Sequence, residues 1–378
     1  MTSETRRCFQ WQGALKSALT STNKYLWMLL SKFSQPLAYV IPMQQTSTNN
    51  QAAKVIQQAI AAADRRCRSR LPLLKHQNTI GLTVLTIALA GMIMSGIGYI
   101  FWGLPAWLTI LISTFFAALS HEIEHDLIHK LYFRSNAVIY HLMMSLVWLM
   151  RPNTVNPWYR RQMHLNHHKA SGTKDDLEER ILGNGMKFGF FRLLISLDTF
   201  FSISLRAKEL GRLKQFSYFN FVLKGAPLAH IYLLALYGFL GFYGYDVVTT
   251  AMGLQVNYPG TLLTAVEWLD TLAVIWLLPN ALRAICLHGI SAALHYYGDV
   301  DHLNKQCQVL NHWALLPVQL LCCNFGSTHI IHHFYVRQPF YIRQLIAKEI
   351  HQVMREQGIR FNDFHSLVRA NRFNLIEK

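Results

Sequence analysis

The stretch that decides the fold of this chain is residues 80–129, IGLTVLTIALAGMIMSGIGYIFWGLPAWLTILISTFFAALSHEIEHDLIH. It contains two long apolar runs, 80–102 and 104–120, with only a short turn at Gly103 and Pro105 between them. A helix needs about 20 mostly apolar residues to cross a bilayer. The stretch therefore predicts a tight transmembrane hairpin whose second helix ends in a histidine-rich segment.

A second pair of apolar runs lies at residues 226–243 and 262–282, so the sequence predicts four spans in two hairpins. Glu267 and Asp270 fall in the last run, and we place them near its outer end, at the membrane interface. Shorter or interrupted apolar runs predict helices in the plane of the membrane or, for the last one, a re-entrant segment: 25–41, 138–150, 188–205 and 309–323.

The distribution of charge predicts the orientation of the spans. Only 15% of the 378 residues are charged, against about 25% in a soluble domain, yet the net charge is +16. All 36 Lys and Arg lie before the first span, between the second and third, or from Arg283 onward, and the loops 102–105 and 244–261 contain none. Cytoplasmic loops retain Lys and Arg, so both termini and the loop 121–225 are predicted to be cytoplasmic, in an integral multi-pass membrane protein. Topology and anionic lipid headgroups account for the basic charge, and no nucleic-acid partner is expected.

Nine of the 18 histidines form three clusters on the predicted cytoplasmic side. Residues i, i+3 and i+4 share one face of a helix, whereas adjacent residues diverge by about 100°, so neighbouring histidines can bind different ions. Imidazole is a ligand for iron, copper, zinc and nickel, and a single zinc takes about four ligands. So many histidines therefore predict two metal ions. The clusters are HEIEHDLIH (His121, His125, His129), HLNHH (His164, His167, His168) and HIIHH (His329, His332, His333).

The first cluster offers two overlapping pairs with the same spacing, His121 with His125 and His125 with His129. All three would extend over about 12 Å of helix, which is too far for one compact site. We choose His121 and His125 as ligands because they lie nearest the membrane. His129 is then expected to support a ligand or to lie at the surface.

These clusters, their order and the paired hairpins resemble the membrane fatty acid desaturase superfamily, which also includes alkane hydroxylases. The third cluster, in GSTHIIHHFYVRQPF, resembles bacterial acyl desaturases more than alkane hydroxylases, which implies a location in a bacterial inner membrane. The resemblance covers about residues 75–345. It implies an all-α integral membrane fold of two transmembrane hairpins (four spans), with interfacial helices and a cytoplasmic histidine-rich cap. The expected organisation is a cytoplasmic N-terminal segment with an interfacial helix and linker (1–75), a desaturase-like membrane catalytic domain (76–345) and a cytoplasmic helical tail (346–378).

The resemblance also implies a non-haem di-iron centre with nine ligands. The ninth comes from the segment between the last span and the third cluster, where we choose His295. His288 is the substitute, and Ser291 stands where acyl-lipid relatives often have an Asn. Supporting carboxylates are expected from Asp175, Asp176 and Glu122, whereas Glu178 and Glu179 are expected to be solvated. The implied ligands are His121, His125, His164, His167, His168, His295, His329, His332 and His333.

The function implied by the resemblance is O2-dependent desaturation of a fatty acyl chain. Electrons would come from a separate donor of the ferredoxin, rubredoxin or cytochrome b5 type. Hydroxylation of an acyl chain or alkane, and oxidative decarboxylation of a fatty acid to a terminal alkene, stay open as alternatives, because motif spacing does not reveal which C–H bonds meet the metals. A metal transporter or a haem cytochrome b would place its ligands within the spans, and here the histidines lie outside them.

Overall fold

The computed structural model describes residues 46–213 and 216–374. The regular structure of these residues is helical, and they contain two isolated β-bridges, His295 with Cys307 and Val309 with Phe361. The in-plane helix expected at 25–41 lies outside the described residues.

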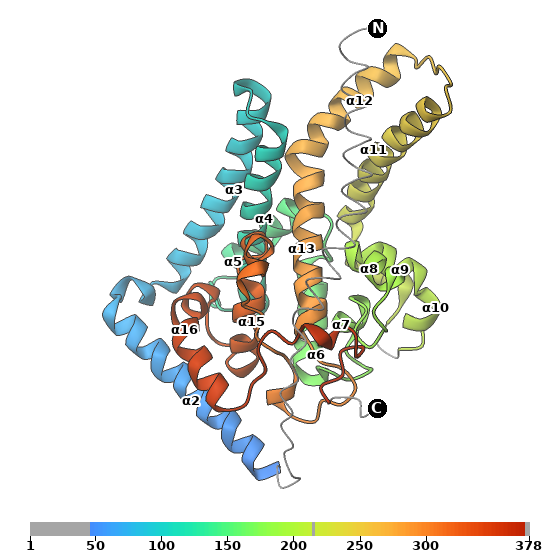
Figure 1. Cartoon of the computed structure of the whole chain (residues 1–378). Coiled ribbons are helices and arrows are strands. Elements are labelled where there is room, and N and C mark those ends of the chain that lie inside the picture. The colour runs from blue at the N-terminus through green and yellow to red at the C-terminus, as the bar shows by residue number, and fades with distance from the viewer. Residues whose placement is uncertain (1–45, 214–215, 375–378) are drawn as a thin grey trace. The chain divides into compact units, whose positions relative to one another are not determined.

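Within residues 46–213 and 216–374, four helices are long and apolar enough to cross a membrane, and they confirm the two predicted hairpins. Figure 1 shows both hairpins extending toward the same end of the compact unit formed by residues 47–378. The chain is therefore an all-α integral membrane protein. The four helices are α3 (Gln77–Trp102), α4 (Ala106–Ile128), α11 (Pro227–Ala251) and the composite helix Gly260–Leu294.

The composite helix is not regular along its whole length. It comprises α12 (Gly260–Leu272), a π-helical segment (Ala273–Leu277) and α13 (Leu278–Leu294). Pro279 lies just after the π-helical segment, where a proline's missing N–H is readily accommodated. Within α12, Asp270 accepts a hydrogen bond from the Tyr243 hydroxyl at 2.7 Å.

Glycine allows the first hairpin to close tightly. Gly103 ends α3 with a φ of +68°, a left-handed conformation that favours glycine. A Cβ atom on Gly91 would lie 2.3 Å from the Phe116 ring, and one on Gly81 would lie 2.6 Å from the Tyr132 ring. The chain around α3 and α4 thus packs too closely for larger side chains at these two positions.

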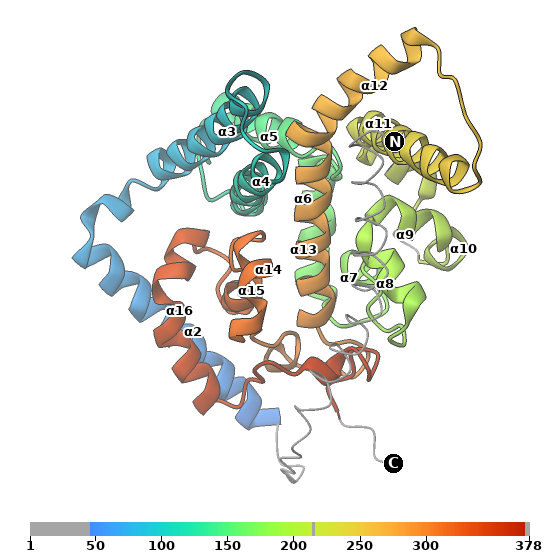
Figure 2. The same cartoon turned by 45° about the horizontal axis from the view of Figure 1, so that its top comes forward.

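The remaining helices surround the ends of the spans that carry the histidines (Figures 1 and 2). Arg192 and Asp198 were both expected to interrupt the apolar run 188–205. Asp198 does separate α8 from α9 and accepts a hydrogen bond from the Phe201 N–H at 2.7 Å, whereas Arg192 lies within α8. Trp313–Leu320 and Phe325–Phe334 form a pair bent by 83°. These helices are α5 (Ala137–Met150), α6 (Pro157–Ala170), α7 (Leu177–Ile181), α8 (Phe190–Leu197), α9 (Thr199–Leu205), α10 (Ala207–Leu210), α14 (Leu316–Leu320), α15 (Phe325–Phe334) and α16 (Phe340–Glu356).

The N-terminal helix α2 (Thr46–Arg70) belongs to the same compact unit as the membrane helices. Its Ile56 and Ile60 are fully buried in one core with Ile346 and Ile350 of α16, and Figure 2 shows the two helices side by side. Residues 47–378 form one compact unit, and the boundaries at residues 75 and 345 stay a prediction.

Candidate metal centre

Four segments bring nine histidines together beyond the ends of the spans. The last turn of α4 supplies His125, and His129 follows directly as its C-cap residue. His295 stands immediately after α13. Helix α6 begins at Pro157 with an Asn156 cap that accepts the Tyr159 N–H. Helices α6 and α15 provide the other six, His164, His167, His168, His329, His332 and His333.

The first group of imidazoles consists of His125, His129, His164 and His332, whose ligand atoms all lie within 4.8 Å of one another. The ring centroid of His332 is 4.2 Å from that of His125 and 4.5 Å from that of His129. His168 adjoins this group, because its Nε2 lies 3.0 Å from His332 Nε2 and 3.1 Å from His164 Nε2. Five imidazoles therefore surround one point.

The second group consists of His167, His295, His329 and His333, which are all buried and obey the same 4.8 Å limit. The Nε2 atom of His329 lies 3.2 Å from His295 Nε2 and 3.1 Å from His333 Nε2. The adjacent histidines of HLNHH and HIIHH thus divide between the two groups, as their angular separation on a helix predicts.

The partners of the outer ring nitrogens show that these residues fit metal ions. In four rings, Nδ1 faces a carboxylate or amide oxygen, which a neutral imidazole satisfies by donating its Nδ1–H. The Nε2 atoms that face inward then carry lone pairs, and lone pairs about 3 Å apart repel unless a cation lies between them. The four contacts are His164 with Glu178 (2.9 Å), His167 with Asp176 (2.8 Å), His295 with Glu179 (3.0 Å) and His333 with Gln306 (2.9 Å).

Burial keeps most of these rings in the neutral form that binds metals. It lowers the pKa of His295 to about 3 and that of His129 to about 2. For His167, burial lowers the pKa, but the adjacent Asp176 carboxylate outweighs it and raises the pKa to about 10. A metal ion bound by His167 would therefore displace a proton from its Nε2.

The first histidine cluster is arranged differently from its sequence prediction. His129, expected outside the site, is a member of the first group, whereas His121 belongs to neither group. The His121 Nδ1 atom instead lies 3.4 Å from guanidinium nitrogens of Arg151 and Arg160. The reason is that α4 continues to Ile128, beyond the predicted end of the span at residue 120, so its later turn is the one that faces α6 and α15.

The two alternative ligands of α13 lie outside both groups. His288 contacts the Ser196 carbonyl oxygen at 3.2 Å and the Thr199 hydroxyl at 3.3 Å. The Ser291 carbonyl oxygen lies 3.2 Å from His295 Nδ1, so Ser291 supports the ring of His295 through its backbone.

The carboxylates after the second cluster form most of the support for the rings. Asp176 holds His167 as expected, whereas Asp175 is exposed. The expectation that Glu178 and Glu179 are solvated is wrong, because Glu178 contacts His164 and Glu179, only 3% exposed, contacts His295. Glu178 and Glu179 follow HLNHH closely in the sequence. That proximity was the signal that could have indicated their contacts with the histidine rings.

Buried ion pairs of α4 were also missed from the sequence. Glu122 pairs with Arg343 of α16 and not with a histidine. Arg343 also pairs with Asp126, whose carboxylate accepts the Tyr132 hydroxyl and the Phe340 N–H. These contacts fix α16, and the chain leading from α15 into it, against the turn of α4 that carries His125.

The comparison with known families agrees with this geometry. A family model described as "Fatty acid desaturase" matches residues 100–365, which include all three histidine clusters. This chain belongs to the fatty acid desaturase family. No curated protein matches it. Membership of this family supports an oxidoreductase of the desaturase or hydroxylase type that acts on acyl chains in a membrane.

Proposed function

We propose that this desaturase uses two iron ions and O2 to introduce a double bond into a fatty acyl chain. The observation that carries the proposal is the convergence of eight imidazoles in two groups of four, with His168 beside the first group. In four of these rings the outer nitrogen already contacts a carboxylate or amide oxygen. The first ion would be held by His125, His129, His164, His168 and His332, and the second by His167, His295, His329 and His333.

Bound iron supplies the activation of O2 and the cleavage of an unactivated C–H bond, which no side chain provides. The chain supplies the geometry. Asp176, Glu178 and Glu179 orient three of the rings, and the buried pairs of Arg343 with α4 hold the first and third clusters together. The burial of the rings excludes water from the centre.

The membrane spans and the distribution of charge support the rest of the proposal. Apolar hairpins beside the histidine groups suit an acyl chain. The loops without Lys or Arg support a centre on the cytoplasmic side of a bacterial inner membrane, together with both termini. Electrons would be delivered there by a separate ferredoxin-, rubredoxin- or cytochrome b5-type protein.

The direct test is expression in a bacterial host, with lipids and hydrocarbons analysed by gas chromatography–mass spectrometry and iron measured in the purified protein. We expect about two iron ions per chain and new double bonds that are absent with the His332→Ala variant. New alcohols would indicate hydroxylation and new terminal alkenes would indicate decarboxylation, in place of desaturation, by the same metal centre. A chain that binds no iron and leaves the lipids unchanged would contradict the proposal.

A further inference from the structure

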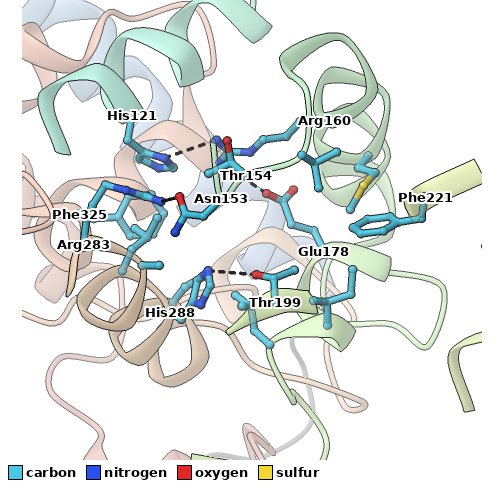
Figure 3. Close-up of a pocket in the computed structure, with 17 residues that line it drawn as sticks. His121, Asn153, Thr154, Arg160, Glu178, Thr199, Phe221, Arg283, His288 and Phe325 are labelled. Atoms are coloured by element: carbon cyan, nitrogen blue, oxygen red, sulfur yellow. Dashed lines mark hydrogen bonds and ion pairs between the residues drawn. The ribbon is translucent and has the colours of Figure 1, made fainter. Parts of the chain in front are cut away.

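A cavity of about 110 Å³ adjoins the first group of histidines. Figure 3 shows His121, Arg160, Arg283 and His288 around it, contributed by α4, α6 and α13. Glu178 forms part of its wall and also contacts His164 Nδ1 at 2.9 Å. One side chain therefore joins this cavity to the candidate metal centre.

Arg283 is the unusual feature of the cavity. It lies in the span Gly260–Leu294, and only 2% of the residue is exposed. Among the residues that the structure describes, its hydrogen-bond partner is the Asn153 side-chain oxygen at 3.2 Å, and its Nε has none. A charged residue in a span is costly and marks a functional site whose partner has to be identified.

The charges around the cavity leave the Arg283 guanidinium uncompensated. Arg151 and Arg160 share the Glu124 carboxylate, and Glu178 is paired with both Arg160 and His164. The three guanidinium groups, including that of Arg283, are therefore balanced by only two carboxylates, Glu124 and Glu178. The nearby acids Glu122 and Asp126 are occupied by Arg343, so an anion is the missing partner.

The size of the cavity and its walls limit what that anion can be. A volume of about 110 Å³ is well below the roughly 300–1,000 Å³ that encloses a drug-sized molecule. Apolar side chains, including Ile181, Phe221 and Leu287, line the rest of it. A carboxylate with the first part of an alkyl chain fits this combination, and the planar guanidinium matches a carboxylate in two parallel hydrogen bonds. The carbonyl group of an ester or thioester carries no negative charge and would leave the Arg283 guanidinium uncompensated.

We propose that Arg283 binds the carboxylate of a free fatty acid in this cavity. This inference rests on the proposed function and names its substrate class as the unesterified acid. Because Glu178 belongs both to the cavity wall and to the support of His164, the carboxyl end of the substrate lies beside the first group of histidines.

The experiment is a displacement assay on the purified, full-length, iron-loaded protein in detergent. Tritiated palmitate is bound, then displaced by unlabelled palmitate, methyl palmitate or palmitoyl-coenzyme A. Loss of a charge-assisted hydrogen-bonded pair lowers affinity at least about tenfold. We therefore expect methyl palmitate and the thioester to displace at least about tenfold less well than palmitate. If methyl palmitate displaced the bound palmitate as well as unlabelled palmitate does, the inference would be overturned by this experiment alone.

Variants then locate the contact. In Arg283→Gln, palmitate and methyl palmitate should displace about equally well. Arg283→Lys keeps the positive charge but not the planar guanidinium, so it should retain part of the preference for the acid. Arg337→Gln removes an exposed arginine and should leave the preference intact. An unchanged preference in Arg283→Gln, or its loss in Arg337→Gln, would overturn the assignment to Arg283.

The readouts separate this inference from the proposed function. Binding is measured without turnover, and iron content is determined on every variant. If palmitate and its ester bind alike but an esterified lipid is desaturated, the carboxylate site is wrong and the proposed function stands. If palmitate is preferred through Arg283 but no lipid is oxidised by the iron-loaded protein with an electron donor, the carboxylate site stands and the proposed function fails.

Discussion

Asp176 makes two contacts at the start of α7, and a single substitution can keep one of them while it weakens the other. One carboxylate oxygen accepts the Glu179 N–H at 3.3 Å, and the other contacts His167 Nδ1 at 2.8 Å. Asp176→Asn keeps the size and a capping oxygen but removes the negative charge that orients His167. Loss of such a supporting contact lowers metal affinity about 10–100-fold, which titration of the iron-loaded protein with a chelator will measure.

The adjacent acid provides the matched control for this experiment. Asp175 is exposed, so Asp175→Asn makes the same chemical change one residue away. Its iron affinity should equal that of the unmodified protein. Equal losses in the two variants would mean that the charge of the acidic turn matters and not the contact with His167.

The choice between His121 and His129 is a second test at the level of single residues. His129 contributes to the first group and His121 does not. His129→Ala should therefore lose much of the iron, whereas His121→Ala should retain it, as measured by mass spectrometry of metal content in purified protein. The reverse result would restore the pairing of His121 with His125 that proximity to the membrane favours.

Close packing around the α3–α4 hairpin can be tested at one glycine. A methyl group on Gly81 would meet the buried ring of Tyr132, whose hydroxyl donates to Asp126 at 2.7 Å. Gly81→Ala should therefore destabilise the protein by about 1–3 kcal/mol and displace a residue that anchors Arg343. Thermal unfolding in detergent, followed by circular dichroism, will detect the change.

The other hairpin supplies the control for the same substitution. Gly238 in α11 is exposed, and nothing lies within 4 Å of a Cβ atom built there. Gly238→Ala should leave the unfolding temperature unchanged or raise it slightly, because alanine favours helix more than glycine does. A drop equal to that of Gly81→Ala would show that glycine itself, and not the contact with Tyr132, is needed in these helices.

Elements defined by local sequence were predictable, and their exact ends were not. Apolar length alone predicts the four spans, and Asp198 predicts the break between α8 and α9. The end of the second span was placed too early, at residue 120, because His121, Glu122 and Glu124 are polar in sequence yet buried in the structure. Their partners, Arg343 among them, come from distant segments, and no local pattern reveals such pairing.

The histidine groups show what can be predicted for the molecule as a whole. Spacing within HLNHH and HIIHH predicts that adjacent rings diverge, and the structure places His332 and His333 in different groups. Spacing cannot predict which ring of one cluster meets which ring of another, because His125 and His332 are brought together only by the packing of α4 against α15 and α16.

The orientation of the whole molecule gives the last prediction. The loop 244–261 contains no Lys or Arg, whereas the tail after Leu294 is basic, so the positive-inside rule places them on opposite sides of the membrane. Asn257 and Arg337 are both exposed. The six native cysteines are first changed to alanine, and the iron content of this cysteine-free chain is checked. Asn257 or Arg337 is then replaced by cysteine.

A membrane-impermeant maleimide should label the Asn257→Cys chain in intact spheroplasts and the Arg337→Cys chain only after the membrane is permeabilised. The charges determine this outcome because moving a basic segment through the bilayer during insertion is unfavourable, whereas a loop without Lys or Arg crosses easily. The opposite labelling pattern would place the histidine groups outside the cell. A soluble cytoplasmic electron donor could not reach them there, so the same measurement also tests where the iron centre obtains its electrons.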